Sequence, residues 1–237
     1  MNQQPIEKKI IFKTGQPSKE DLLDVADIFL TIQGEGPFTG RRAIFIRLAG
    51  CNLQCPACDT DYTSDREDLT IDNIVDRVIA LTPLSLVPGL VVITGGEPFR
   101  QNISLLSNWL IELGYTVQIE TNGTLAPSPG LSESVVIVCS PKTGKMNPEI
   151  RERADCFKYV MHSESVSHID GLPLLALDHT AKPEVARPPN NGKPVYLQPM
   201  DSLDIQQNYK NQEAVLLSCM GYGHILQLQL HKIIGVD

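Results

Sequence analysis

The segment that decides the fold is AIFIRLAGCNLQCPAC, residues 43–58, in which an apolar run leads directly into three cysteines. Residues 43–49 are predicted to form a strand, because apolar side chains dominate this run. Cys51, Cys55 and Cys58 follow with the spacing C-x3-C-x2-C. Three thiolates on one short loop can bind three irons of a 4Fe–4S cluster. The fourth iron would then lack a protein ligand, which lets a cluster act on a small molecule as well as transfer electrons.

Other uses of these cysteines stay open on the spacing alone. A structural zinc site takes four Cys or His ligands, and the sequence has no partner C-x2-C or H-x3-H pair. A ferredoxin-type cluster would need a fourth thiolate from Cys139, Cys156 or Cys219, none of which has a matching local spacing. Redox cysteines are a further alternative. A disulfide framework is not expected in a chain of this length without a secretory signal.

Length and charge narrow the class of protein. The 237 residues suit one α/β domain, since α/β barrels reach about 250 residues. The formal net charge of −8, without a basic run, argues against nucleic-acid and anionic-membrane partners. The start MNQQPIEKKI lacks the apolar region of a signal peptide, and the longest apolar stretches are too short or too interrupted to span a bilayer. We therefore expect a cytoplasmic protein.

Short apolar runs alternate with helical patterns along the rest of the chain. This alternation predicts βαβ units and an α/β fold whose mostly parallel sheet forms a partial, open β/α barrel. We predict a single domain over residues 25–237 and an N-terminal extension of unknown role over residues 1–24. Further strands are expected at 90–94, 116–120, 134–139, 156–160 and 194–198, with alternation again at 225–230; helices are expected after Thr70, from Asn102 to Leu113, after Asn147 and over 203–217.

Loops with glycine or polar residues follow several of the predicted strands. Because the carboxyl ends of parallel strands meet at one edge of a sheet, we expect these loops to lie together. In Thr94-Gly-Gly-Glu-Pro98 the glycines either form an ordinary turn or let the backbone approach a ligand, since no Cβ intervenes. The loops are 50–62, 94–98, 121–124, 140–142 and 199–201.

Arg47 stands alone among apolar residues on the strand that precedes Cys51. A buried unpaired charge is costly, so this arginine needs a partner. The partner is either a carboxylate in a structural salt bridge or the carboxylate of a ligand, which a guanidinium binds with two hydrogen bonds. The Gly34-Glu35-Gly36 segment offers a similar choice between an exposed turn and a ligand-binding carboxylate.

The cysteine spacing and the ITGGEP segment (93–98) resemble the radical S-adenosylmethionine (SAM) enzymes, in which SAM chelates the open iron and is cleaved to a 5′-deoxyadenosyl radical. Within that superfamily, the chain resembles the 7-carboxy-7-deazaguanine synthase family over about Asp27 to the C-terminus. The segments QGEG (33–36), CDT (58–60) and LQLHKIIG (228–235) carry this resemblance, together with IETNGT (119–124), CSPK (139–142) and YLQPMD (196–201).

The resemblance implies a reaction and its site. Members convert 6-carboxy-5,6,7,8-tetrahydropterin into 7-carboxy-7-deazaguanine by radical ring contraction with loss of ammonia, assisted by magnesium. No catalytic side chain is assigned beyond the cluster and SAM. The implied ligands are Cys51, Cys55 and Cys58 for the 4Fe–4S cluster; Ala57, Asp59, Gly96, Ser140, Pro141, Lys142, Gln198, Pro199, Met200 and Asp201 for SAM; Ile32, Gln33, Gly34, Glu35, Arg47, Thr94, His231 and Asp237 for the pterin; and Thr60 for magnesium.

The same resemblance implies a homodimer and an electron donor such as flavodoxin or ferredoxin. At Ala57 the chain departs from many radical SAM loops, which carry an aromatic residue near the adenine. Two alternatives remain at this point. A glycyl-radical-activating enzyme would share the cysteine spacing but would not need QGEG or Arg47, and a non-catalytic iron–sulfur or zinc module would leave the GGE and SPK loops unexplained.

Overall fold

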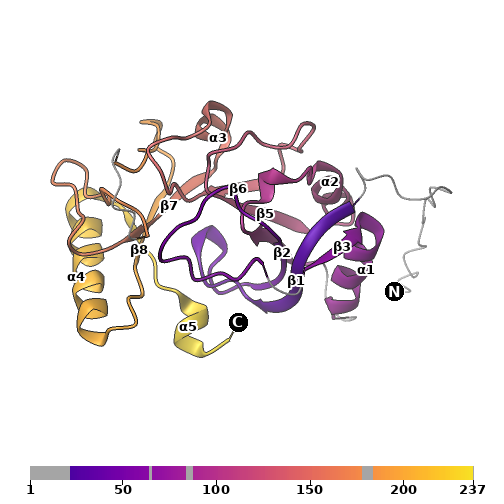
Figure 1. Cartoon of the computed structure of the whole chain (residues 1–237), viewed down its shortest axis with the longest axis horizontal. Coiled ribbons are helices and arrows are strands. Elements are labelled where there is room, and N and C mark those ends of the chain that lie inside the picture. Colours follow the sequence, from indigo (N-terminus) through magenta and orange to yellow (C-terminus); the bar gives the residue numbers. More distant parts are fainter. Residues whose placement is uncertain (1–21, 64–65, 84–87, 178–183, 237) are drawn as a thin grey trace, which may run out of the picture.

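One open sheet of nine strands organises the computed structural model, which describes residues 22–63, 66–83, 88–177 and 184–236 (Figure 1). The strand order is β3-β1-β2-β4-β5-β6-β7-β8-β9. The strands are β1 (Leu22–Ile32), β2 (Arg42–Leu48), β3 (Glu67–Thr70), β4 (Leu90–Gly95), β5 (Thr116–Thr121), β6 (Val136–Cys139), β7 (Cys156–Met161), β8 (Val195–Pro199) and β9 (Ile225–Leu226). The helices are η2 (Gly36–Phe38), α1 (Ile71–Leu81), η3 (Pro98–Arg100), α2 (Ser104–Glu112), α3 (Pro148–Arg153), α4 (Ile205–Tyr222) and α5 (Leu230–Ile234).

The sheet is parallel from β2 to β9, and antiparallel only where β1 pairs with β2 and with β3. The predicted open, mostly parallel α/β sheet is therefore confirmed. Strands β1 and β3 were not predicted from the sequence. β1 contains Asp24 and Asp27, and its register with β2 shifts between Val25 and Asp27, so its apolar alternation is interrupted. β1 begins at Leu22, whereas the domain boundary was predicted between residues 24 and 25.

Side-chain caps start two helices where the sequence predicts them. Thr70 Oγ1 accepts a hydrogen bond from the Asn73 amide at 3.2 Å, which satisfies one of the unpaired donors in the first turn of α1. Asn147 caps α3 in the same way. Helix α2 differs slightly, because it begins at Ser104 and Asn102 binds that residue from just outside the cap.

The C-terminal region differs more from its sequence pattern. The helix predicted over residues 203–217 is α4, which Asp204 caps and which extends to Tyr222. The apolar alternation over residues 225–230 forms only the two-residue strand β9, and α5 follows it. The reason lies in the segment after β1: Gly36 donates to the Gln227 side chain at 2.6 Å, and the Leu230 amide donates to the Gly34 carbonyl at 3.2 Å. These bonds turn the chain away from the sheet.

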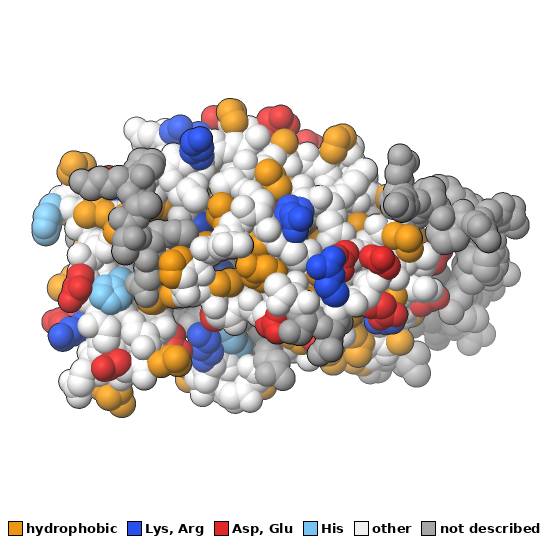
Figure 2. Space-filling view, in the orientation of Figure 1, with side chains coloured by type: hydrophobic (Ala, Val, Ile, Leu, Met, Phe, Trp, Pro, Cys, Tyr) orange, Lys and Arg blue, Asp and Glu red, His pale blue; other side chains and the backbone are white. Residues whose placement is uncertain are grey.

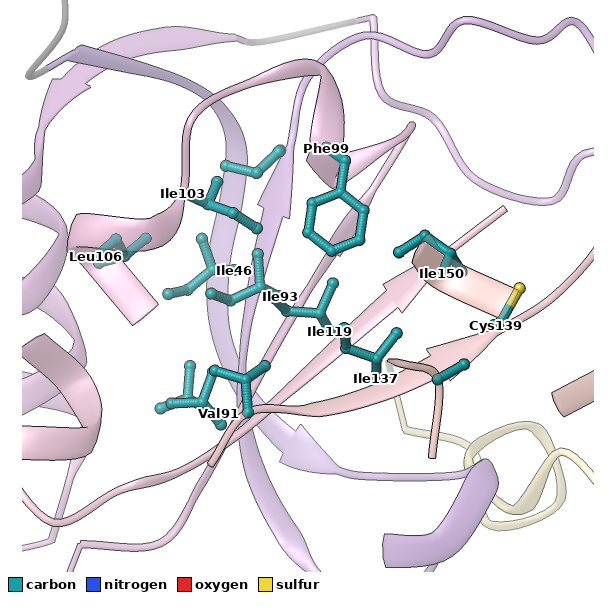
Figure 3. Close-up of a cluster of buried hydrophobic side chains, with 14 of the residues drawn as sticks. Ile46, Val91, Ile93, Phe99, Ile103, Leu106, Ile119, Ile137, Cys139 and Ile150 are labelled. Carbon is teal, nitrogen blue, oxygen red and sulfur yellow. The ribbon is translucent and has the colours of Figure 1, made fainter. Parts of the chain in front are cut away.

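One face of the sheet is apolar. Figure 3 shows Ile46, Val91, Ile93, Ile119 and Ile137 from adjacent strands packed side by side. Buried side chains of α1 and α2 cover them, and each such burial contributes about 1.5–3 kcal/mol. Figure 1 places α1 and α2 toward one end of the sheet and α4 toward the other.

The opposite face carries polar and charged side chains, because successive residues of a strand point to opposite faces. On β2, Ile46 lies in the apolar core whereas Arg47 lines a cavity. The same alternation separates Ile119 from Glu120 on β5, and Phe157 from Lys158 on β7.

Charged side chains also lie on the outer surface of the molecule. Acidic and basic side chains are interspersed on the side of the molecule shown in Figure 2. In the described residues, every helix is too short or too polar to cross a membrane.

Candidate active site

A cavity of about 510 Å³ lies at the carboxyl edge of the parallel strands. Its wall combines the cysteine loop, the segment after β1, the ends of β4, β5, β6 and β8, and the C-terminal helix α5. The predicted site residues in this wall are Ile32, Gln33, Gly34, Glu35, Arg47, Cys51, Cys55, Ala57, Cys58, Asp59, Thr60, Thr94, Gly96, Ser140, Lys142, Gln198, Met200, Asp201 and His231. Pro141 is outside the wall, Pro199 lines a smaller neighbouring pocket, and Asp237 lies outside the described residues.

The three cysteines of the loop all line the cavity. Cys51 and Cys55 are half-buried and Cys58 is exposed. Burial raises the pKa of the Cys51 and Cys55 thiols, while the Lys142 ammonium opposes this effect at Cys55. The Leu53 amide donates to Cys51 Sγ at 3.4 Å. Three thiols on one loop that face a shared cavity are a donor set suited to a 4Fe–4S cluster.

The other cysteines are placed differently. Cys139 lies in the apolar core, Cys156 is buried on β7 and Cys219 is on α4. The described cavity wall includes none of them. They differ from the loop cysteines in location as well as in spacing.

Two glycines fit the end of β4 against the start of the cysteine loop. A Cβ on Gly96 would lie 2.1 Å from the Gly50 carbonyl oxygen, and one on Gly95 would lie 2.1 Å from the Leu48 carbonyl oxygen. The Gly96 amide donates to Leu48 and the Glu97 amide donates to Gly50, at 3.1 and 3.0 Å. Because backbone cannot shift cheaply at both contacts, any side chain here would displace the loop that carries Cys51.

Glu97 fastens the next strand to this junction. Its buried carboxylate accepts hydrogen bonds from the Thr121 hydroxyl and the Asn122 amide, both at 2.7 Å, and from the Phe99 amide. Burial raises the pKa of Glu97, and these hydrogen bonds act in the opposite direction. Asn122 Nδ2 in turn binds the Asn52 side chain at 3.0 Å. The resemblance of 94–98 to the GGE segment of radical SAM enzymes implies that the Glu97 carboxylate meets the amino group of SAM. In the structure Glu97 is fully buried, lies outside the described cavity wall and connects the ends of β4 and β5 to the cysteine loop.

A network of buried charges forms another part of the wall. The Lys158 ammonium contacts Glu35 Oε2 and lies 3.9 Å from Glu120 Oε2. Gln229 donates to Glu35 Oε1 at 2.9 Å. Gln33 and Gln118 donate to Glu120 Oε1 at 3.1 and 3.0 Å.

Of this network, sequence reasoning found Gln33 and Glu35 but missed Glu120, Lys158, Gln118 and Gln229. The available signal was the one that identified Arg47, a charge within an apolar strand. Lys158 lies between Phe157 and Tyr159, both of which are fully buried.

Arg47 lines the cavity with its guanidinium 5.5 Å from the centroid of the Phe29 ring. This stacked arrangement is favourable for arginine and restricts its orientation. In the described part of the chain, no carboxylate lies within salt-bridge distance of Arg47. Thr94 neighbours Arg47 across the parallel β2–β4 pair and donates to Glu120 Oε2 at 3.5 Å.

The predicted SAM-binding side includes a polar atom that the folded protein does not satisfy. Gln198 is 3% exposed and lines the cavity, and its Oε1 has no hydrogen-bond partner in the described structure. A buried acceptor without a partner is costly, so this atom suits a ligand with a donor group. Lys142 Nζ donates to the Ser140 carbonyl at 3.1 Å, and burial, then the nearby Lys158 charge, lower the pKa of Lys142.

The C-terminal helix α5 packs beside the segment after β1. A Cβ on Gly34 would lie 1.9 Å from His231 Nδ1, so glycine allows this close approach. Lys232 Nζ lies 3.4 Å from both Asp59 Oδ2 and Asp201 Oδ2 and so connects α5 to the cysteine loop and to β8. His231 lies in α5 and lines the cavity, so the alternative of a histidine that ends a strand does not apply.

Thr60, the predicted magnesium ligand, lines the cavity beside Asp59, with 3.5 Å between Thr60 Oγ1 and Asp59 Oδ1. In the described residues, no group of three or more His, Cys, Asp or Glu side chains forms a metal-ion site. Magnesium binding at Thr60 therefore stays a prediction.

The fold and the cavity define an α/β protein with a three-cysteine iron–sulfur site, and residues 32–122 match the family model of a 4Fe-4S single cluster domain. Two curated proteins named 7-carboxy-7-deazaguanine synthase are similar over nearly the whole chain. The one from Rhodospirillum rubrum is 37% identical over 225 residues, 93% of this chain and 95% of the relative. The one from Rickettsia prowazekii is 41% identical over 223 residues, 91% and 89% respectively. The chain belongs to the 7-carboxy-7-deazaguanine synthase family.

A solved structure agrees with this fold. The crystal structure of QueE from Escherichia coli superposes with a TM-score of 0.68, at 23% identity, over 91% of this chain and 100% of that one. At this identity the likeness concerns the fold alone. It matches the open sheet described above.

Proposed function

We propose that this chain is a radical SAM enzyme that converts 6-carboxy-5,6,7,8-tetrahydropterin into 7-carboxy-7-deazaguanine by radical ring contraction with loss of ammonia. The observation that carries the proposal is that one cavity is lined by three cysteines, by Arg47 and by the nearly buried carboxylates of Glu35 and Glu120. A cluster site and a site for a carboxylated, amino-bearing heterocycle are thus adjacent. Membership of the 7-carboxy-7-deazaguanine synthase family supports the same reaction.

The cofactors would bind at the cysteine loop and at the ends of β4, β6 and β8. Cys51, Cys55 and Cys58 would hold a 4Fe–4S cluster through thiolates. The unpartnered Gln198 Oε1, and the close backbone at Gly96, fit a ligand such as SAM with donor groups. When bound, the reduced cluster and SAM would supply a 5′-deoxyadenosyl radical to start the reaction. The remaining predicted SAM contacts in the wall are Ala57, Asp59, Ser140, Lys142, Met200 and Asp201.

The chain's own side chains would bind and orient the pterin. Arg47 would bind the substrate carboxylate with two parallel hydrogen bonds, in a geometry restricted by Phe29. Glu35 and Glu120 would accept hydrogen bonds from the amino-pyrimidine edge, whose adjacent N–H groups match carboxylate oxygens. His231 on α5, held close to Gly34, would cover the pterin and exclude water. Asp237, which lies outside the described residues, is proposed as a further contact.

Further partners belong to the same proposal. Mg²⁺ would bind at Thr60 and would keep several waters, because magnesium commonly takes few protein ligands. An electron donor such as flavodoxin or ferredoxin would reduce the cluster. A cytoplasmic location would keep the thiols reduced.

We also propose a homodimer. On α4, the large apolar side chains of Ile205, Tyr209, Leu217 and Met220 are each more than 60% exposed, next to the edge strand β9. Exposed apolar side chains beside a free sheet edge are typical of an interface. Light scattering should give twice the chain mass for the wild-type protein and a single chain mass for Met220→Glu. A monomeric wild type would contradict this part of the proposal.

Turnover of the cluster-loaded protein tests the reaction. The protein is reconstituted with iron and sulfide under anaerobic conditions and incubated with SAM, a reductant, Mg²⁺ and the pterin, and products are identified by mass spectrometry. We expect 7-carboxy-7-deazaguanine only when the pterin and SAM are both present, and none from Cys55→Ala. Cleavage of SAM without any conversion of the pterin would contradict the assigned substrate.

A further inference from the structure

Lys158 is a buried cation in the cavity wall to which the proposed reaction assigns no role. It lies on β7 between Phe157 and Tyr159, whose side chains belong to the apolar core on the other face of the sheet. Its own side chain is 9% exposed and points to the cavity side. A lysine in such a place is retained only with partners, because burying an ammonium without them is costly.

The two partners of Lys158 come from separate parts of the fold. Glu35 lies in the segment after β1, and Glu120 is at the end of β5. Their side chains are 13% and 18% exposed. A single ammonium therefore lies between two nearly buried carboxylates, and it joins three elements that are far apart in the chain.

Amide side chains fix the other oxygen of each carboxylate. Gln229 donates to Glu35 Oε1, whereas Gln33 and Gln118 donate to Glu120 Oε1. The Oε2 atoms of both carboxylates are the ones that face Lys158. With both oxygens of each group engaged, the carboxylates have a set orientation in the cavity wall.

Titratable groups around Lys158, Glu35 and Glu120 come from several neighbouring elements. Besides Glu35 and Glu120, Lys158 is influenced by Asp59 of the cysteine loop, and it acts on Cys156 of β7 and on Lys142 after β6; His231 of α5 acts on Glu35. Burial alone would raise the pKa of Glu35, but the Lys158 charge and the hydrogen bonds from Lys158 and Gln229 lower it to about 2. Burial also disfavours charged Lys158, yet Glu35 and Glu120 raise its pKa above the ordinary value.

We propose that Lys158 is a positioning residue that binds Glu35 and Glu120 together and orients both side chains toward the cavity, so that they form a preset acceptor pair for the amino-pyrimidine edge of the substrate. The inference rests on the proposed function, which supplies the pterin. Without the Lys158 cation, burial would favour the protonated form of Glu35, because burial alone raises the pKa of this carboxyl group. A protonated carboxyl group presents one acceptor fewer to the substrate.

Binding of the pterin at several pH values tests this role separately from catalysis. The full-length, cluster-loaded protein with SAM but no reductant is titrated anaerobically with 6-carboxy-5,6,7,8-tetrahydropterin by calorimetry between pH 5.5 and 8.5. The quantity compared is the ratio of variant to wild-type Kd at each pH, because this ratio cancels protonation of the free pterin. The variants are Lys158→Met, which removes the charge, and Lys158→Arg, which keeps it.

For Lys158→Met we expect the Kd ratio to reach about 10 to 100 at the acid end and to decrease as the pH rises, since Glu35 then ionises without the help of Lys158. For Lys158→Arg we expect one ratio across the pH range. Arg77→Met is the matched control, because Arg77 forms an exposed ion pair with Glu67 and lies on α1, away from the cavity. Its ratio should stay close to 1.

A purely structural role gives a different result. If Lys158→Met unfolds more easily but binds the pterin with a Kd ratio near 1 at every pH, the inference is wrong. If Lys158→Met does not retain its cluster, the double variant Lys158→Met/Glu35→Gln is compared with Glu35→Gln alone, and a pH-independent ratio near 1 overturns the inference. A wild-type protein that neither binds nor converts the pterin contradicts the proposed function instead.

Discussion

The two faces of the central sheet are built from alternate residues of the same strands, yet they differ in almost every physical respect. One face carries Ile46, Ile93 and Ile119, which are fully buried among other apolar side chains (Figure 3). The other face carries Arg47 and Glu120 one residue further along. The apolar face stabilises the fold through burial, which does not depend on direction. The polar face needs directed partners for each group.

This difference shows why the site depends on the correct register of strand pairing throughout the sheet. A shift of one residue in the pairing of any strand would exchange the two faces, placing Glu120 in the core and Ile119 in the cavity. The apolar face strongly opposes such a shift. The hydrophobic core thereby fixes which side chains reach the cavity, although none of its members is part of the described cavity wall.

The largest difference between the two faces is expected when cysteines are replaced. Cys51→Ala, Cys55→Ala or Cys58→Ala is expected to abolish cluster binding and SAM cleavage, because each removes one iron ligand. Cys139→Ala is the matched control on the apolar face, where it should cost about 1 kcal/mol of stability and leave the cluster intact. Iron and sulfide content with the visible absorption spectrum measures both. Cluster loss in Cys139→Ala, Cys156→Ala or Cys219→Ala would indicate a four-thiolate site and contradict the open-iron site.

A large-to-small change in the apolar face should affect stability without affecting the site. Ile93→Ala is expected to lower the free energy of unfolding by about 2–5 kcal/mol, because it leaves a cavity in a fully buried cluster. Denaturant unfolding measures this change. Pterin affinity of the folded fraction should remain within about twofold of the wild type. A stronger loss of affinity would show that the two faces are not independent.

At Arg47, on the polar face, we expect the opposite combination: weaker pterin binding with little change in stability. Arg47→Lys keeps the charge but loses the two parallel hydrogen bonds that we propose to the substrate carboxylate. We expect pterin binding about 10- to 150-fold weaker, from the roughly 1.5–3 kcal/mol of one charge-assisted hydrogen bond, and little change in unfolding. Unchanged affinity combined with a lower melting temperature would make Arg47 a structural residue.

The smallest effect concerns the acid stability of the polar face. Because the pKa of Glu35 is lowered from 4.5 to about 2 in the folded protein, its ionised form stabilises the fold above pH 4.5. That contribution should be lost as the pH falls from 4.5 toward 2. The unfolding free energy of wild type minus that of Glu35→Gln should therefore decrease over this range, by about 1–3 kcal/mol. A difference that grows on acidification would mean that Glu35 is not held as a carboxylate.

The sequence predicted most of the apolar face and less of the polar one. Strands β2, β4, β5 and β7 were identified because continuous apolar runs mark buried parallel strands. Strand β1 was not predicted because Asp24 and Asp27 interrupt the alternation of its apolar residues. The apolar residues at 225–230 suggested a long strand. The Gln227 side chain instead binds the Gly36 amide in the segment after β1, and the chain continues into α5. The local sequence pattern does not encode such a long-range contact.

Within the site, the residues next to glycine or cysteine motifs were found, and those inside strands were mostly missed. A single polar residue at the end of a strand ordinarily faces solvent, so Glu120 gave little indication of its place while the second face of the sheet was unknown. Arg47 was identified because it stands alone among apolar residues on the strand that leads to the cysteine loop. Lys158, flanked by two buried aromatic residues, could have been identified by the same argument.

The central claim is that the polar face of the sheet holds the substrate beside the cluster. A crystal structure of the cluster-loaded protein, grown anaerobically with SAM and 6-carboxy-5,6,7,8-tetrahydropterin, tests it most directly. The pterin is expected on the cavity face, with its carboxylate on the Arg47 guanidinium and its amino-pyrimidine edge toward Glu35 and Glu120. A pterin bound elsewhere, or one whose carboxylate points away from Arg47, would contradict the account.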